Sequence, residues 1–383
     1  MRYLTVDLFE DFQCIAGACP NSCCIGWKIP VEKNIFKEMQ RHEEELGISA
    51  AGWLKKEDGE YYSVILDGQR CPMLTRENLC QVVLRLGPEY LSRTCSLFPR
   101  SFNQYGGVVE RYLSASCPEV ISMLMDKDVI EFSVSEDLEP EPEYAHMQLY
   151  QFESAVRAGL VSMLQEFPQI ALNARLFASF MILQKAVGMY QEHRLDIPAI
   201  QLEIAACLDE RNLYALEEKL NGSVDENARF RLLSQLPALA NEFALTGRFE
   251  GQVQRAVRYF AEVDHAQYLS DVEAFKKSCC LPYHAFYSNY WVYRIFADTL
   301  SIPDYEKSKE KMIYIGMKFA MFQSIALAGF AEHGRLDRTE YLSIISSLSR
   351  ETENNAYFRH LLAARIRDNH LVSAAGLLLL IVT

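Results

Sequence analysis

Histidine is scarce where this chain is richest in cysteine. The first 117 residues contain eight of the eleven cysteines but only one of the eight histidines, His42. This scarcity of imidazole indicates a site whose ligands are thiolates alone. Thiolates select iron–sulfur clusters, zinc or Cu(I) over cations that prefer oxygen ligands.

Positive charge is also in short supply. The 383 residues include 38 Lys and Arg against 51 Asp and Glu, which gives a net charge of −13. A surface that binds nucleic acid needs clustered basic residues to contact phosphates, so we expect no nucleic-acid partner. An acidic surface instead tolerates a lysine-rich protein as a partner.

The common motifs of enzyme sites are missing. The chain has no P-loop and no GxGxxG after a strand, which argues against a standard Rossmann-type cofactor site. It also lacks the GxSxG motif of hydrolases and the HExxH motif of metalloproteases. No catalytic residue can therefore be named from a motif.

Membrane and secretory signals are weak. The first residues are acidic where a signal peptide would be apolar, so we expect a cytoplasmic protein with reduced thiols rather than disulfides. The apolar run 313–330 contains Lys318, and the run 371–382 is too short to cross a bilayer. We therefore expect buried core helices here and no membrane span.

Residues 1–125 are predicted to form an irregular cysteine-rich domain pinned by metal. Within it, the pattern predicts a helix that begins at Pro30 and ends at Gly47, and a strand over 60–66. Residues 102–113 are typical of a β-hairpin that turns at Gly106-Gly107.

Residues 145–383 have a different pattern. Apolar residues recur there at three-to-four spacing through successive segments, which predicts an all-helical domain. Residues 126–144, between the two regions, are strongly acidic and contain two prolines, as is typical of a linker. The sequence thus predicts a mainly α protein with two domains.

Eight cysteines are the candidate metal ligands. They are Cys14, Cys19, Cys23, Cys24, Cys71, Cys80, Cys95 and Cys117. Eight thiolates would suffice for two structural zinc ions, whereas a [4Fe–4S] cluster needs four and leaves four to pack around it or hold a second centre. Proline follows three of these cysteines, which weakly favours iron–sulfur because Cys-Pro also occurs in bacterial ferredoxins. The spacing does not decide which four bind.

An aromatic segment over 284–294 is a second candidate site. Tyr287, Tyr290, Trp291 and Tyr293 would suit a pocket for a lysine side chain or an adenine ring. The alternative is a helix in an aromatic core.

These cysteine and aromatic motifs resemble those of one family, the flagellin lysine-N-methylase (FliB) proteins. The N-terminal part also resembles the YkgJ-type zinc- or iron-chelating cysteine family. The resemblance spans most of the chain, and its N-terminal motifs are the more specific. The matching strings are CxxxxCxxxCCxxWxI at 14–29, CPML…C at 71–80, SRTCSLFPR at 92–100, LSASCPE at 113–119 and SNYWVYRIF at 288–296.

The resemblance implies methyl transfer from S-adenosylmethionine (SAM) to lysine ε-amino groups of flagellin by a protein with a [4Fe–4S] cluster. Zinc is the alternative metal, and a metal-chelating adaptor without methyltransferase activity is the alternative function. The family pattern names no SAM ligands.

Candidate cofactor-binding residues come from their positions in the chain. Trp27 follows the Cys23-Cys24 pair by three residues and Arg100 follows Cys95 by five, so both should lie near the metal. An arginine there would pair with the SAM carboxylate in bidentate fashion. We expect Trp27, Arg100, Tyr287 and Tyr290 in a cleft between the two domains, since ligand pockets favour such interfaces.

Overall fold

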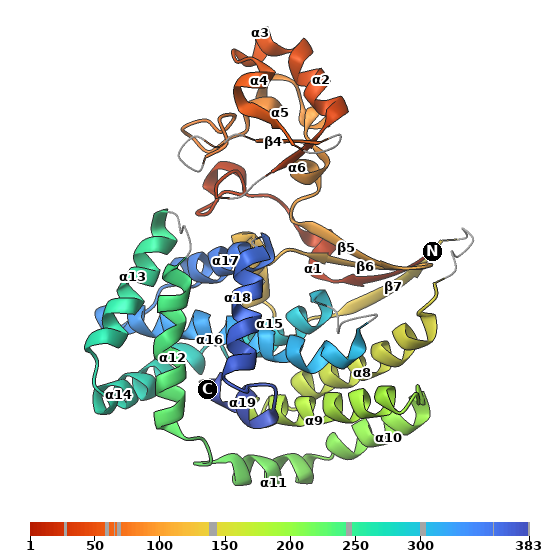
Figure 1. Ribbon diagram of the computed structural model, residues 1–383, viewed down its shortest axis with the longest axis vertical. Helices are drawn as coiled ribbons and strands as arrows, with labels where there is room; N and C mark the ends of the chain where they lie inside the picture. The colour runs from red at the N-terminus through yellow and green to blue at the C-terminus, as the bar shows by residue number, and fades with distance from the viewer. Residues whose placement is uncertain are drawn as a thin grey trace.

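A small lobe stands apart from the rest of the molecule at the top of Figure 1. The computed structural model describes residues 1–26, 29–57, 61–64, 66, 70–137, 144–242, 247–298, 304–354 and 356–381. The lobe, taken here as the described residues between 29 and 97, has an antiparallel sheet in the order β2-β4-β3. Its elements are β2 (Pro30–Glu32), α2 (Lys33–Arg41), α3 (Glu43–Leu46), α4 (Ala50–Trp53), β3 (Leu54–Lys56), β4 (Tyr61–Val64), α5 (Gln81–Arg85) and α6 (Arg93–Leu97).

The lobe differs from the sequence prediction at one helix start. Pro30 lies in the edge strand β2, paired with β4, and not in a first helical turn. An edge strand tolerates proline because one side of its backbone needs no partner. The predicted helix is divided at His42 into α2 and α3, and α3 ends where Gly47 takes a left-handed φ of 71°. The predicted strand is confirmed as β4.

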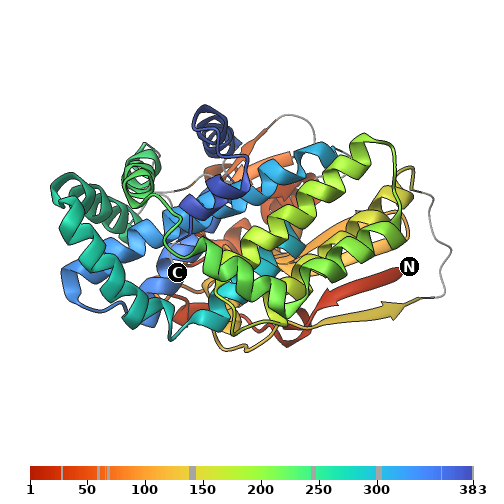
Figure 2. The same ribbon diagram turned by 90° about the horizontal axis from the view of Figure 1, so that it is seen from below.

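A second sheet joins segments that are far apart in the sequence. Its strands are β1 (Arg2–Val6), β5 (Arg100–Tyr105), β6 (Val108–Leu113) and β7 (Phe132–Glu136), in the order β5-β6-β1-β7. Strands β5 and β6 form the predicted hairpin, and Gly106-Gly107 makes its turn. Strand β1 lies parallel to β6 and antiparallel to β7, and Figure 2 shows β1 and β7 side by side along one edge of the molecule.

This sheet brings the predicted linker into the fold. Strand β7 lies within 126–144, and its backbone pairs with β1 over its whole length. The largest hydrophobic core contains Val6 and Phe12 as well as residues of the C-terminal helices. The division into domains at residues 125 and 144 stays a prediction.

Helices dominate the remainder, so the prediction of a mainly α protein is confirmed. Two short helices of the N-terminal region, α1 and α7, pack with them. The helices are α1 (Leu8–Asp11), α7 (Pro118–Met125), α8 (Met147–Gln165), α9 (Leu172–Gln191), α10 (Ile197–Cys207), α11 (Glu210–Leu220), α12 (Glu226–Asn241), α13 (Gly247–Glu262), α14 (His265–Phe275), α15 (His284–Ala297), α16 (Ser308–His333), α17 (Arg338–Asn354), α18 (Ala356–Asp368) and α19 (Ala374–Leu379).

Aspartate side chains cap the N-termini of several of these helices, α10, α11, α12 and α14 among them. Asp196, Asp209, Asp225 and Asp264 each accept hydrogen bonds from backbone N–H groups of the first turn. Such caps satisfy amides that have no partner inside the helix. Local sequence therefore accounts for where α10, α11, α12 and α14 begin.

Helix α16 is the central helix of the core. It is long and apolar enough to cross a membrane, but 94% of its most apolar window is buried inside the protein. Helices α12, α13, α15, α17 and α18 pack against it. The apolar run 313–330 is thus a buried core helix, as the sequence predicted.

Candidate functional site

Seven of the eight N-terminal cysteines line one cavity of about 460 Å³, which we name the cysteine cavity. The eighth, Cys71, lines an adjoining cavity of about 150 Å³. The seven come from four separate stretches of the chain: Cys14, Cys19, Cys23, Cys24, Cys80, Cys95 and Cys117. Folding thus gathers all eight candidate ligands in one place.

Backbone contacts position these thiols. The N–H of Cys71 donates to the carbonyl oxygen of Cys24 at 2.8 Å, which joins two distant cysteine stretches. Cys80 and Cys117 are the residues immediately before helices α5 and α7. Helix N-termini favour negative charge, so these two positions suit thiolates.

The thiols fall into two groups by their mutual electrostatic repulsion. One group surrounds Cys24 and the other surrounds Cys14. The first consists of Cys24, Cys71, Cys80 and Cys95. The second consists of Cys14, Cys19 and Cys117. Cys23 hydrogen-bonds to Cys24 and is repelled by Cys24 and Cys95 more than by Cys14, so it lies nearer the first group while facing both.

Burial keeps several of these thiols neutral. It raises the pKa of Cys71 to about 12 and the pKa values of Cys95 and Cys117 to about 11. Cys24 differs, because the hydrogen bond from Cys23 lowers its pKa although burial opposes this. A bound cation would be needed to hold most of the group as thiolates.

The cysteines fit a thiolate-bound centre in donor type and in place. All are free thiols, and none is paired in a disulfide. However, within the described part of the chain no three His, Cys, Asp or Glu side chains already converge as metal ligands. Metal binding would therefore have to draw these sulfurs together.

Helix α17 holds the first cysteine stretch against the helical region. The Arg350 guanidinium donates to the side chain and the carbonyl oxygen of Asn21 at 3.1 and 3.0 Å, and to the carbonyl oxygen of Ile25 at 2.8 Å. Asn21 in turn donates to the hydroxyls of Ser346 and Ser347 on the same helix. The cysteine cavity is thus anchored to the helical core.

A second cavity of about 600 Å³ lies between the small lobe and the helices, and we name it the interface cavity. The lobe contributes residues of β2 and α6 to its lining, and the helical region contributes residues of α15, α16, α17 and α18. Phe98 and Arg100 line both the interface cavity and the cysteine cavity. The two cavities are therefore neighbours.

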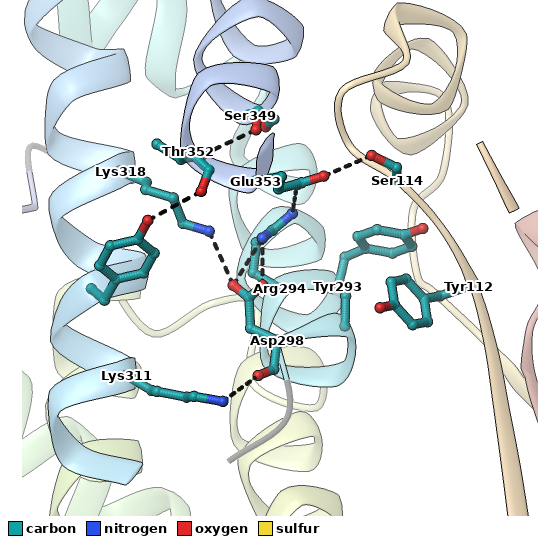
Figure 3. Close-up of polar contacts among 12 residues, drawn as sticks. Tyr112, Ser114, Tyr293, Arg294, Asp298, Lys311, Lys318, Ser349, Thr352 and Glu353 are labelled. Carbon is teal, nitrogen blue, oxygen red and sulfur yellow. Dashed lines mark hydrogen bonds and ion pairs between the residues drawn. The ribbon is translucent and has the colours of Figure 1, made fainter. Parts of the chain in front are cut away.

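Two buried cations and two half-buried carboxylates line the interface cavity and form one ionic network (Figure 3). The guanidinium of Arg294, only 3% exposed, donates to the Asp298 carboxylate at 3.1 and 2.5 Å and to Glu353 at 2.6 Å. Lys318, also 3% exposed, donates to Asp298 at 3.1 Å. Glu353 further accepts hydrogen bonds from the Ser114 hydroxyl at 2.7 Å. Three helices and the loop after β6 thus meet in one ionic network.

The network shifts the pKa values of its members. Burial lowers the pKa of Lys318 to about 8, and Arg294 adds to that lowering. Burial alone would raise the pKa of Asp298, but Arg294 and Lys318 hold it below its ordinary value. Burial raises the pKa of Tyr112, on the cavity wall, to about 12. Perturbed groups in a cleft are typical of functional sites.

Of the four residues predicted to bind the cofactor, one lies beside the cavities, two lie in the core and one is not described. Arg100 lies between the two cavities, with its guanidinium over the rings of Phe9 and Phe12. Tyr287 and Tyr290 are buried in the aromatic core, where the Tyr287 hydroxyl lies 3.2 Å from that of Tyr341. Trp27 lies outside the described residues. The roles proposed for these four residues stay predictions.

Arg294, Asp298, Lys318 and Glu353 are not among the site residues predicted from the sequence. Two features of the sequence point to these residues. Lys318 interrupts an apolar run, and a charged residue there must find a partner when the helix is buried. Arg294 and Asp298 are four residues apart, the spacing of a helical ion pair.

Comparisons with known proteins identify the same family as the cysteine and aromatic motifs of the sequence. Residues 157–380 match the family model described as the FliB lysine N-methylase C-terminal domain. A lysine-N-methylase of Salmonella choleraesuis strain SC-B67 is 23% identical over 96% of this chain and 98% of its own length. The lysine-N-methylase of Salmonella typhimurium strain LT2 is 22% identical over 94% of each chain.

A shorter relative covers part of the chain. The flagellar biosynthetic protein FliU of Salmonella muenchen is 35% identical over 33% of this chain and 80% of its own length. No solved structure matches. Because the family model covers more than half of the chain, this protein belongs to the family of FliB lysine N-methylases.

Proposed function

We propose that this protein transfers methyl groups from SAM to lysine ε-amino groups of flagellin, and that the transfer takes place in the interface cavity. Family membership and the printed names of the relatives, lysine-N-methylase and flagellar biosynthetic protein, support the reaction and the substrate. The net charge of −13 suits a lysine-rich partner. Family membership disfavours the alternative, an adaptor without methyltransferase activity.

The buried ionic network is the observation that carries this location. Lysine has an ordinary pKa of about 10.4, so the substrate amine must lose a proton before it attacks a methyl group. Desolvation and nearby bases both promote that loss. The interface cavity offers the Asp298 and Glu353 carboxylates to a lysine, and it offers Lys318, whose pKa is depressed, as a base.

SAM would supply an activated methyl group on a sulfonium sulfur. We propose Arg100 as the partner of its carboxylate, because Arg100 lines both cavities and arginine binds carboxylates in bidentate fashion. We assign aromatic walls of the site to Tyr112 and Tyr314, which line the interface cavity.

We propose a [4Fe–4S] cluster at the cysteine cavity, with zinc as the alternative. The mutual repulsion of Cys24, Cys71, Cys80 and Cys95 suggests these four as one ligand set. The other four thiols then surround it or hold a second centre. Bound metal would stabilise the lobe, because binding energy becomes folding energy when the site is not preformed. Reduced thiols also favour a cytoplasmic location.

The test is a methylation assay with the purified full-length protein, SAM and flagellin, read by mass spectrometry of flagellin lysines. We expect SAM-dependent methylation by the wild type and at least about a 100-fold loss in Asp298→Asn. Asp304→Asn is the matched control, since Asp304 lies on the surface in an ion pair with Lys307. No transfer by the wild type would contradict the proposed function. An unaffected Asp298→Asn would move the reaction out of the interface cavity.

A further inference from the structure

Lys318 is a buried lysine that faces a cavity. Its side chain is 3% exposed, yet it belongs to the lining of the interface cavity (Figure 3). Its ammonium donates to Asp298 at 3.1 Å and lies 5.0 Å from the centre of the Tyr314 ring. A lysine in such a place keeps little water around its charge, so its neutral form is favoured.

Asp298 does not depend on Lys318 for a partner. Two nitrogens of Arg294 already bind its two carboxylate oxygens, at 3.1 and 2.5 Å. Lys311 donates to its backbone carbonyl oxygen, at 3.0 Å. Lys318 can therefore lose a proton without leaving the Asp298 carboxylate as an unpaired buried charge.

The charges of the network balance only while no further cation is present. Arg294 and Lys318 carry two positive charges, and Asp298 and Glu353 carry two negative ones. A lysine ammonium entering the cavity adds a third positive charge in a desolvated place. Loss of one proton restores the balance, and the buried primary amine of Lys318, which lines the cavity, can lose it and then take a proton back.

We propose that Lys318 is the catalytic base of this site and takes the proton from the ε-ammonium of the substrate lysine. This inference rests on the methyl transfer proposed above. The proton moves from the substrate nitrogen to neutral Lys318 Nζ, and the freed lone pair forms the new C–N bond. The C–S bond of the sulfonium donor breaks, and its electron pair stays on sulfur. Lys318 then returns its proton to water.

Charged and titratable groups face Lys318 from several elements. Arg294 lowers its pKa further, and Asp298 and Glu353 oppose the lowering. Arg294 lies in α15, and Asp298 directly follows that helix. The other groups around Lys318 are Lys311 and Tyr314 of α16, Glu353 of α17, Arg359 of α18 and Tyr112 of β6. With burial, they set the pKa of Lys318 at about 8.

The experiment compares single-turnover methylation of flagellin by the wild type and by Lys318→Arg, Lys318→Met and Lys311→Met as pH rises. We expect the wild-type rate to rise tenfold per pH unit and to level off near pH 8. Lys318→Arg and Lys318→Met should be at least about 100-fold slower and lose this inflection. Lys311→Met should keep it, which identifies the lysine that titrates.

Two further readouts separate a base from a structural residue. Propylamine should restore the rate of Lys318→Ala in proportion to its free-base concentration, which a merely structural role does not predict. An NMR titration of the lysine Nζ groups in the wild type, without any substrate, should show one midpoint near pH 8 that is missing in Lys318→Arg. If Lys318→Met fails to fold, Lys318→Arg and the amine rescue still decide the question.

The outcomes are distinct. A wild type that methylates flagellin, with Lys318 variants of unchanged rate and pH profile, overturns the role of Lys318 alone. A rate that keeps rising toward the ordinary lysine pKa of about 10.4 also overturns it, since the substrate would then be the only group that titrates. A wild type that transfers no methyl group overturns the proposed function, and the role of Lys318 with it.

Discussion

The small lobe and the helical region are stabilised in different ways. The buried core of the lobe has eleven residues, from Ile29 to Val82, and one of them is Cys71. The helical region shares one continuous core that runs from Val6 to Ile381. Small domains bury too little apolar surface to be stable on apolar burial alone. The lobe therefore has far less buried apolar surface to stabilise it than the helices have.

The candidate chemistry lies where these two regions meet. Arg350 and Glu353 are one helical turn apart on α17, and they contact different cavities. Arg350 holds the loop of Asn21 beside the cysteine cavity, whereas Glu353 binds Arg294 in the interface cavity. Helix α17 thus connects the cysteine cavity, whose cysteines lie largely on loops, with the interface cavity, whose charged residues lie on packed helices.

The largest effect should come from removing the metal ligands. We expect Cys71→Ser or Cys95→Ser to lose bound metal and to expose the lobe to proteases, because binding energies of structural zinc reach about 10–16 kcal/mol. The helical region should keep its far-UV circular dichroism. Metal analysis and limited proteolysis measure both effects. Cys207→Ser, in α10, is the control, and an unchanged lobe in the ligand variants would show that it folds without metal.

Breaking the buried network should destabilise the helical region next most strongly. Arg294→Met leaves the Asp298 and Glu353 carboxylates with one fewer buried partner, which costs about 3–5 kcal/mol. Urea unfolding followed by circular dichroism measures this loss. Arg194→Met removes an exposed ion pair with Glu192 and should cost less than about 1 kcal/mol. Equal effects would mean that burial of the network contributes no stability.

The third effect is a pH dependence of stability. The pKa of Lys318 is about 8 in the folded protein and 10.5 ordinarily, so between these values the unfolded chain holds more protons. The free energy of unfolding must then rise with pH, by up to about 3 kcal/mol from this group. Lys318→Met lacks this rise. Melting temperatures of both proteins at pH 7 and about pH 9.5 test it, and parallel changes would refute the depressed pKa.

The smallest effect concerns the boundary between the two cavities. Arg100→Ala should weaken SAM binding by about 10- to 100-fold, the loss expected for a bidentate hydrogen-bonded pair, while the metal stays bound. Isothermal titration calorimetry with SAM measures it. Arg111→Ala, on the neighbouring strand of the same hairpin with its guanidinium over the Tyr3 ring, is the control. Unchanged affinity in Arg100→Ala would exclude Arg100 from the SAM site.

Local patterns in the sequence determined much of the fold. The Gly106-Gly107 turn predicted the β5–β6 hairpin, and three-to-four periodicity predicted most of the helices. Periodicity is a property of one segment, so it can be recognised without knowledge of the rest of the chain. The same reasoning identified α16 as a core helix despite its apolar length. It did not identify the strand at Pro30.

Tertiary structure decided everything that depends on segments far apart. Strand β1 pairs with β6 and β7, more than 100 residues away, and no local pattern encodes such pairing. The cysteines were recognisable as candidate ligands by type, but only folding brought all eight to two adjoining cavities. Lys318, Arg294 and Glu353 lie on three different helices, so their shared cavity exists only once those helices pack. The residue types came from the sequence, and their chemistry came from burial and neighbours.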